Sequence, residues 1–158
     1  MLHIIAVGKL KEPFYRTAAA EYEKRLKAYG GIRITELPEV RLPENPSPAQ
    51  IQAALQKEAD TVLQKLPKGC WLCVLTPEGT SLSSEQLAKK LQSVRSSGKS
   101  ELVFLIGSSF GLDHTLKEKG DFLLSMSSMT FPHHLARIIV LEQLYRAESI
   151  LNGSKYHK

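Results

Sequence analysis

The chain has 158 residues, of which 42% are hydrophobic and 23% are charged, and 21 Lys and Arg against 16 Asp and Glu give a formal charge of +5. These values are typical of a globular protein and exclude a disordered or collagen-like chain. The modest basic excess favours a polyanionic partner such as nucleic acid, but many metabolic enzymes are equally basic.

The sequence carries no pattern of a membrane or exported protein. No apolar stretch reaches the roughly 18 residues that a membrane span needs. The apolar start Met1–Gly8 is too short for a signal peptide and lacks a basic leader and a cleavage site. We therefore expect a cytoplasmic protein without a membrane segment. No linker or repeat interrupts the chain, which predicts one domain over residues 1–158.

Strand and helix patterns alternate from the N-terminus. The apolar run Leu2–Val7 predicts a strand that ends at Gly8. Apolar residues at steps of three or four predict a helix from about Pro13 to Tyr29, stopped by two glycines. Ile32–Leu37 alternates in polarity and predicts a second strand.

The next segment is a proline-rich loop followed by a helix. Ser47 precedes a proline and stands three residues before Gln50, which is the pattern of a capping box with proline at the first helical position. The predicted helix ends at Pro67 and has one apolar face, made of Ile51, Leu55, Val62 and Leu66.

Two further strands enclose another capped helix. Trp71–Thr76 is apolar throughout, as expected for a strand covered on both faces, and Pro77–Gly79 predicts a turn after it. A second capping box begins at Ser83 and predicts a helix to about Ser96. Leu102–Ile106 is the next apolar strand.

The last third begins with a glycine-rich loop, Gly107–Gly111, and a short helix from Asp113. Phe122–Ser125 predicts a fifth strand, and a final helix is expected from near Phe131 to before Gly153. Strands separated by helices of ten or more residues predict an α/β fold, a parallel sheet with helices on both faces.

No metal or redox site is expected. Cys70 and Cys73 form a C-x-x-C, but they lie in a strand pattern where positions three apart point to opposite faces, and no second pair could complete a zinc site. His133 and His134 are neighbours on a helix, so they diverge by about 100° and cannot chelate one ion. Two buried apolar thiols are the favoured interpretation of the cysteines.

Ligands of open parallel sheets bind beyond the carboxyl ends of the strands. Three such ends are notable here: Leu75–Pro77, Ile106–Ser108 and Ser125–Thr130. The glycine-rich loop is neither a dinucleotide fingerprint nor a Walker A loop, so it predicts no phosphate site. Without further information, the glycine-rich loop is as compatible with a tight turn as with a ligand-binding loop. The polar, sulfur-rich segment Met126–Phe131 is compatible with an ordinary loop before a helix.

The final helix and the tail admit two interpretations. The helix mixes polar and apolar side chains, as does any amphipathic helix that packs on a sheet or a partner subunit. The tail Ser154–Lys158 is basic and aromatic. It is either a solvated terminus or a segment whose Tyr and His stack on bases while Lys pairs with phosphates.

A resemblance to a known family covers the whole chain. The motifs are Val7–Lys11, Tyr22–Leu26, Leu123–Ser125, Ser128–His133, Arg137, Glu142–Gln143, Tyr145–Ala147 and the closing Tyr156–Lys158. In this order and register they resemble the ribosomal RNA large subunit methyltransferase H family, most specifically over Met129–Ala147 together with the Tyr-His-Lys ending.

The resemblance implies a SPOUT fold with a C-terminal trefoil knot, a homodimer, and S-adenosylmethionine as cofactor. It implies methylation of N3 of a pseudouridine in large-subunit (23S) rRNA on the assembled ribosome. Because 158 residues leave little room for a separate RNA-binding module, we expect Lys and Arg on the dimer surface to supply most RNA affinity. By position, the implied cofactor residues are Leu75, Gly107, Met126, Ser127, Ser128, Met129, Thr130 and Phe131. The family usually has two successive glycines where this chain has Gly107 and Ser108, and Phe110 is bulky.

The imide N3 is a poor nucleophile until it loses its proton, so a base or cationic group should assist. Arg137, Tyr156 and His157 are the candidates, and in a dimer the tail could complete the partner's site. Three alternatives remain: a knotted methyltransferase acting on tRNA, a non-catalytic ribosome-binding factor of the same fold, and a nucleotide-binding α/β protein, which the missing phosphate loops disfavour.

Overall fold

The structure is a computed structural model that describes residues 1–157. Its strands are β1 (Leu2–Val7), β2 (Ile32–Leu37), β3 (Trp71–Ser81), β4 (Leu102–Ile106) and β5 (Phe122–Ser125). Its helices are α1 (Pro13–Leu26), α2 (Pro48–Lys65), α3 (Ser84–Ser96), α4 (His114–Lys119) and α5 (His133–Leu151), with a 3-10 turn, η1 (Lys27–Tyr29).

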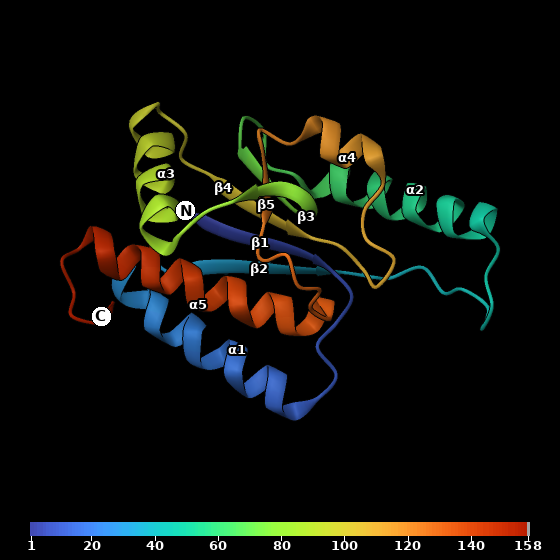
Figure 1. Ribbon diagram of the computed structural model, residues 1–158, viewed down its shortest axis with the longest axis horizontal. Coiled ribbons are helices and arrows are strands. Elements are labelled where there is room, and N and C mark those ends of the chain that lie inside the picture. Colours follow the sequence, from blue (N-terminus) through green and yellow to red (C-terminus); the bar gives the residue numbers. More distant parts are fainter. Residues whose placement is uncertain (158) are drawn as a thin grey trace.

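The strands form one parallel sheet in the order β2-β1-β4-β3-β5. Helices α1, α3 and α5 cover one face and α2 and α4 the other (Figure 1). This arrangement confirms the predicted α/β fold class. Because all strands are parallel, their carboxyl ends lie along one edge of the sheet.

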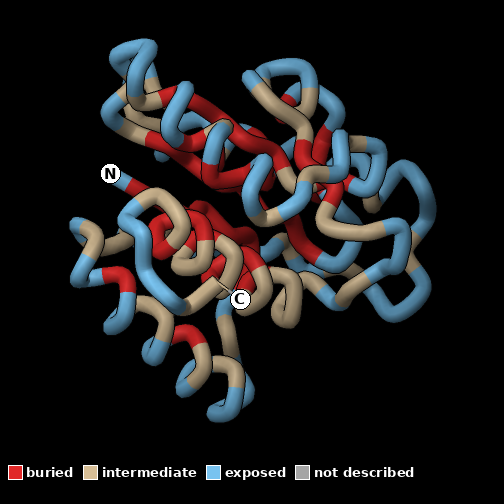
Figure 2. The backbone as a smooth tube through the Cα atoms, turned by 60° about the vertical axis from the view of Figure 1, so that its left-hand side comes forward, coloured by how far each residue is buried: buried red, intermediate tan, exposed pale blue. Residues whose placement is uncertain are grey.

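The two faces of the sheet are each packed by their own apolar cluster. Ile4, Leu102 and Phe104 point toward α1, α3 and α5, whereas Ile5 and Val103 point toward α2 and α4. Every residue of β1 and β4 is buried, and Figure 2 shows the buried residues concentrated between the helical layers. Burial on both faces explains why these strands read as continuous apolar runs.

The two predicted capping boxes are confirmed. The hydroxyl of Ser47 accepts a hydrogen bond from the Gln50 N–H at 3.1 Å, and the Gln50 side chain accepts from the Ser47 N–H at 2.8 Å. Ser83 and Gln86 repeat both contacts at the start of α3. Each box provides hydrogen-bond partners for two backbone N–H groups at the helix N-terminus, and so fixes where α2 and α3 begin.

The predicted helix boundaries are confirmed, but one predicted turn is wrong. The first helix is α-helical to Leu26, and η1 completes it to Tyr29. The final helix begins at His133, close to the expected start. The predicted turn at Pro77–Gly79 lies inside β3, where the register shifts between Leu75 and Thr80. A Cβ at Gly79 would lie 2.6 Å from the Leu123 backbone, so glycine permits this close approach to β5.

The cysteines are separated by the sheet. Cys73 is fully buried in the cluster under α3 and α5, and burial raises the pKa of its thiol. Cys70 is half-buried and packs toward the opposite cluster. In the part of the chain that the structure describes, no group of three His, Cys, Asp or Glu is placed to hold a metal ion. No helix within residues 1–157 is long and apolar enough to cross a membrane.

Candidate functional site at the carboxyl edge of the sheet

The three segments singled out by the sequence lie on or after adjacent strands. Leu75 lies within β3, whereas Gly107 and the segment 126–131 follow β4 and β5 directly. Val74 of β3 is the register partner of Leu105 of β4, and Leu75 is the partner of Leu124 of β5. Since β4, β3 and β5 are consecutive in the sheet, these segments lie near one another toward one edge. Leu75, Gly107 and the segment 126–131 are therefore brought together.

The loop after β4 folds back tightly on its first residue. A Cβ at Gly107 would lie 2.4 Å from the carbonyl oxygen of Gly111 and 2.7 Å from the Leu112 side chain. Only glycine fits there without displacing backbone. The Gly111 N–H donates to the Ser108 carbonyl at 2.9 Å and closes a turn that leaves Ser109 and Phe110 exposed.

The segment after β5 is held by its own serines. The Ser125 hydroxyl donates to the Ser127 carbonyl at 3.2 Å, and the Ser127 hydroxyl accepts from the Met129 N–H at 3.0 Å. Ser128, Met129 and Thr130 are exposed, and Phe131 is half-buried. The segment thus presents small hydroxyls, backbone groups and a thioether at the strand edge.

A cavity of about 280 Å³ opens beside the first residue of this segment. Ser125 and Met126 line it, together with the apolar Leu87, Phe104 and Val140. The other polar residues in its lining are Ser83, Ser84 and Gln143. Largely apolar walls with a few polar groups are the usual character of a small-molecule site.

Hydrogen bonds connect two of these polar lining residues to the C-terminal tail. The Ser84 hydroxyl donates to the side-chain amide oxygen of Gln143 at 2.6 Å, and the Gln143 amide nitrogen donates to Glu142 at 2.7 Å. Glu142 then accepts from the Tyr156 hydroxyl at 3.2 Å and from Arg146. Partial burial and the nearby Glu142 carboxylate raise the pKa of Tyr156. The tail therefore folds back onto α5 of its own subunit.

His157 has partners on both ring nitrogens. Nε2 lies 2.6 Å from Glu85 at the start of α3, and Nδ1 lies 3.3 Å from Arg146. The guanidinium of Arg146 also stacks over the Tyr156 ring, 4.9 Å from its centroid. The last residue of the predicted tail, Lys158, lies outside the described residues.

Arg137, the third predicted catalytic residue, is directed to another part of the fold. Its side chain is 2% exposed, and its guanidinium donates to Glu36 at 2.6 Å and to the Gly8 carbonyl at 2.7 Å. Partial burial opposes the ionisation of Glu36, but the hydrogen bonds from Arg137 and the Leu10 N–H outweigh it and lower the pKa. Arg137 thus joins α5 to the ends of β1 and β2, whereas the tail contacts α3.

Two glutamates that the sequence did not single out, and His133, adjoin this edge. Glu39 accepts from Ser109 at 3.2 Å, and Glu58 of α2 accepts from Ser108 at 3.1 Å. The Nε2 atom of His133 is buried and has no hydrogen-bond partner within residues 1–157. Burial and the neighbouring His134 lower the pKa of His133, so its ring is neutral at pH 7.

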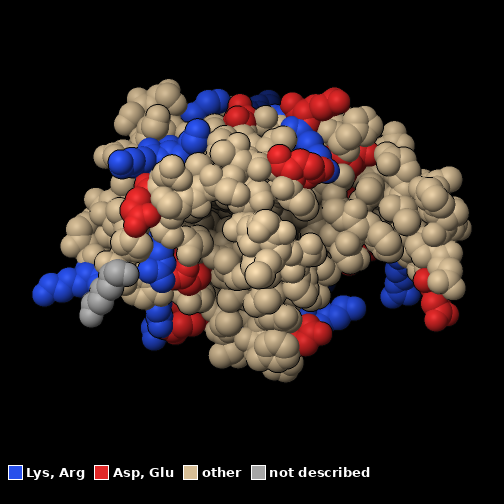
Figure 3. Space-filling view, in the orientation of Figure 1, with Lys and Arg blue, Asp and Glu red and all other residues tan. Residues whose placement is uncertain are grey.

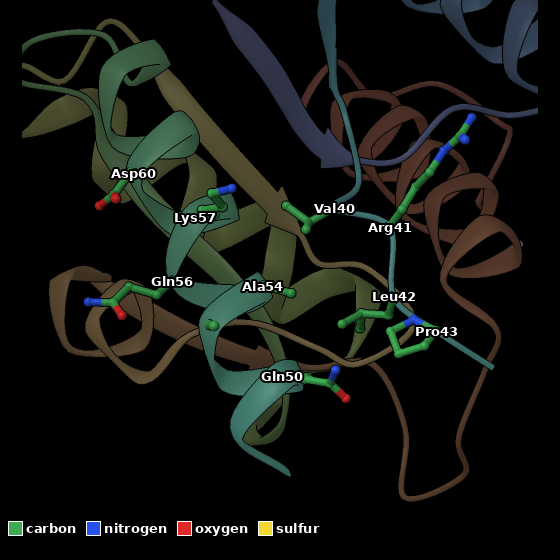
Figure 4. A pocket seen from close by; sticks show the side chains of 10 residues that line it. Val40, Arg41, Leu42, Pro43, Gln50, Ala54, Gln56, Lys57 and Asp60 are labelled. Atoms are coloured by element: carbon green, nitrogen blue, oxygen red, sulfur yellow. The ribbon is translucent and has the colours of Figure 1, made fainter. Parts of the chain in front are cut away.

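A larger cavity, about 480 Å³, lies between α2 and the loop after β2. Figure 4 shows Leu42 pointing toward Ala54, while Arg41 extends away from the cavity. None of the predicted cofactor residues lines it. Size alone therefore does not identify the functional site, and the smaller cavity is the one that adjoins the strand edge.

Comparison with known proteins agrees with this architecture. A family model described as "Predicted SPOUT methyltransferase" matches residues 1–157. Ribosomal RNA large subunit methyltransferase H of Acetivibrio thermocellus is 46% identical over 155 residues, covering 98% of both chains. The protein of that name from Halothermothrix orenii is 41% identical over 157 residues, covering 99% of both.

Solved structures share the fold at low sequence identity. A probable methylase family protein from Haemophilus influenzae matches with a TM-score of 0.55 and 15% identity, over 99% of this chain and 70% of that one. A tRNA methyltransferase from Aquifex aeolicus gives the same TM-score and identity over 92% of this chain and 69% of that one. The near full-length identity to the named relatives shows that this chain belongs to the SPOUT methyltransferases, within the ribosomal RNA large subunit methyltransferase H family.

Proposed function

We propose that the protein uses S-adenosylmethionine to methylate N3 of a pseudouridine in 23S rRNA on the assembled ribosome, in the cytoplasm. The observation that carries the proposal is the 46% identity, over 98% of both chains, to a relative named as a large-subunit rRNA methyltransferase. The position of the base and the state of the ribosome rest on the family resemblance of the motifs.

The cofactor is assigned to Leu75, Gly107 and Met126–Phe131. These residues suit an adenosyl and amino-acid group, because they combine apolar side chains with unshielded backbone groups and small hydroxyls at one strand edge. When bound, S-adenosylmethionine supplies an electrophilic sulfonium methyl. The protein's own part is to fix the loops and exclude water, so that the two reactants meet in line.

Proton removal from the base is assigned to the tail. An imidazole such as that of His157 can accept a proton and the Tyr156 hydroxyl can donate a hydrogen bond, and Glu85 and Glu142 orient these two side chains. Because both ring nitrogens of His157 have partners, one of these contacts must open before the ring reaches a base. Arg137 supports the site by holding the Gly8 backbone rather than by touching RNA.

We also propose a homodimer and a trefoil knot. The surface over the N-terminal half of α5 shows almost no charged side chains in Figure 3. Leu135, Ile138 and Ile139 are only half-buried there, and Phe14 and Met129 are 64% and 75% exposed. A second copy would cover this apolar surface. The knot is supported by the family resemblance of the motifs.

Labelled S-adenosylmethionine offered with unmethylated ribosomes, and separately with tRNA, tests the function. Label in 23S rRNA alone supports the proposal, and label in tRNA alone replaces it with the tRNA alternative. Calorimetry with the cofactor separates an enzyme from a non-catalytic ribosome-binding factor, which should bind the cofactor poorly. Sedimentation equilibrium tests the homodimer.

A further inference from the structure

The loop after β4, residues 107–113, is fastened to α2 and to the segment before it. The Ser108 hydroxyl donates to Glu58 at 3.1 Å, and the Ser109 hydroxyl donates to Glu39 at 3.2 Å. At the far end of the loop, Gln52 donates to Asp113 at 2.9 Å. Three side-chain contacts thus hold a loop that has little regular structure of its own.

Glu58 is the central member of this set. It is 5% exposed, and its two carboxylate oxygens have different partners. One accepts from Ser108 and the other from the Val40 N–H at 2.9 Å. Burial raises the pKa of Glu58, because the charged carboxylate loses its hydration inside the protein. The hydrogen bonds to Ser108 and the Val40 N–H offset part of this loss, and they join the loop after β4 to the loop after β2.

We propose that Glu58 is a positioning residue for cofactor binding: through Ser108 it holds the loop 107–113 in the conformation that receives S-adenosylmethionine. The inference rests on the proposed function. Glu58 does not touch the cofactor segments 75 or 126–131, and it acts on the cofactor only through the loop that contains Gly107.

The physical reason is preorganisation. A loop that is already fixed loses less conformational entropy when a ligand binds, so releasing it weakens binding. The contact is made equally before and during the reaction, so its loss should raise the cofactor Kd and KM and leave kcat nearly unchanged. We expect Glu58→Ala to raise the cofactor Kd by about fivefold to twentyfold, the range expected when one or two ordered side chains are released.

The conservative variant gives a sharp control. In Glu58→Gln the amide oxygen still accepts from the Val40 N–H, and the amide NH₂ donates to Ser108, whose hydroxyl rotates to accept. This variant should keep the cofactor Kd within about twofold of the wild-type value. Thr61→Ala is a second control on α2, because within residues 1–157 the Thr61 hydroxyl donates only to the Lys57 carbonyl of its own helix.

The experiment combines calorimetry with amide hydrogen exchange of the cofactor-free protein. Glu58→Ala and Ser108→Ala should each raise the Kd and speed exchange at residues 109–112, and the double variant should be no worse than the single ones. Thr61→Ala should change neither. If Glu58→Ala fails to fold, Ser108→Ala and Gln52→Ala carry the same test.

The outcomes separate this inference from the proposed function. If the wild type binds S-adenosylmethionine and both alanine variants bind it equally well, Glu58 is not a positioning residue and the function stands. If the wild type binds no S-adenosylmethionine, the proposed function is wrong, and exchange in the loop still reports whether Glu58 holds it. Additive losses in the double variant would also overturn the inference, because Glu58 would then act by another route.

Discussion

Arg137, one turn into α5, donates a hydrogen bond to Glu36 at the end of β2, with 2.6 Å between the Arg137 Nη1 and Glu36 Oε2 atoms. The residues are 101 positions apart in the sequence. The same guanidinium reaches the Gly8 carbonyl at the end of β1. One buried cation therefore joins the last helix to two strand ends at the functional edge of the sheet.

Arg137→Ala should destabilise the protein by about 3 kcal/mol, because it removes the partner of a carboxylate and of a buried carbonyl. Arg137→Met should destabilise the protein less than Arg137→Ala, since the methionine side chain fills most of the volume that the arginine leaves. Arg33→Ala is the control, as the exposed Arg33–Glu101 pair should contribute less than about 1 kcal/mol. Urea unfolding at one fixed protein concentration measures all three, and equal losses for Arg33 and Arg137 would contradict the prediction.

Much of the fold could be predicted, because the local pattern of apolar and polar residues determines most of its strands and helices. Four strands, β1, β2, β4 and β5, have the predicted bounds. An apolar or alternating run between glycine, proline or polar residues is compatible with few other strand boundaries. The extension of β3 could not be found in this way. Pro77 and Gly79 read as a turn, but pairing of Thr80 with Leu124 and of Ser81 with Ser125 of β5 keeps the segment in the sheet.

The site was only partly visible in the sequence. Strand ends predicted the candidate cofactor segments, but the contacts around them join residues far apart in the chain. One signal was overlooked: Glu58 follows Leu55 and precedes Val62 on the apolar face of α2, at helical spacing. A carboxylate in an apolar stripe needs partners, and Ser108 and the Val40 N–H are those partners. Nothing local indicated which loop they belong to.

Glu58→Gln should stabilise the protein more at high pH than at low pH. Burial raises the pKa of Glu58 above its ordinary value of 4.5, so the folded state holds this proton more tightly than the unfolded chain. The wild type therefore loses stability as the pH rises from about 4.5 through the raised pKa, and the glutamine variant does not. Nearby Glu39 adds to the effect through its charge.

Urea unfolding of both proteins at about pH 4 and about pH 7.5 measures this difference. Exposed Glu44→Gln, in the loop before α2, controls for the loss of one negative charge. A gap between Glu58→Gln and the wild type that stays constant with pH, or narrows as the pH rises, would mean that burial does not govern this carboxyl.

Removal of Tyr156–Lys158 should lower kcat on ribosomes by at least about 100-fold, the usual contribution of a proton-transfer group. Cofactor affinity should change little, because Tyr156 and His157 contact Glu142 and Glu85 rather than the strand-edge segments. Single-turnover methylation and calorimetry separate the two effects.

Tyr156→Phe is the matched control for this truncation. It loses one hydrogen bond to Glu142 but keeps the ring under Arg146. It should therefore remain stable and retain the tail's position, so that any loss of rate reports the hydroxyl itself. Unchanged turnover after the truncation would remove the tail from the mechanism.

Lys9 and Lys11 should contribute to ribosome binding through phosphate contacts. Both are exposed and follow β1, which places them at the same edge as the cofactor segments. Each lysine that neutralises a phosphate releases counterions, so its loss should reduce the slope of log affinity against log salt by about one. Lys65→Gln is the control, because Lys65 ends α2 at the opposite edge, before β3 begins. Binding measured across a salt series should show a lower slope for Lys9→Gln and Lys11→Gln and the wild-type slope for Lys65→Gln; three equal slopes would place the RNA elsewhere on the protein.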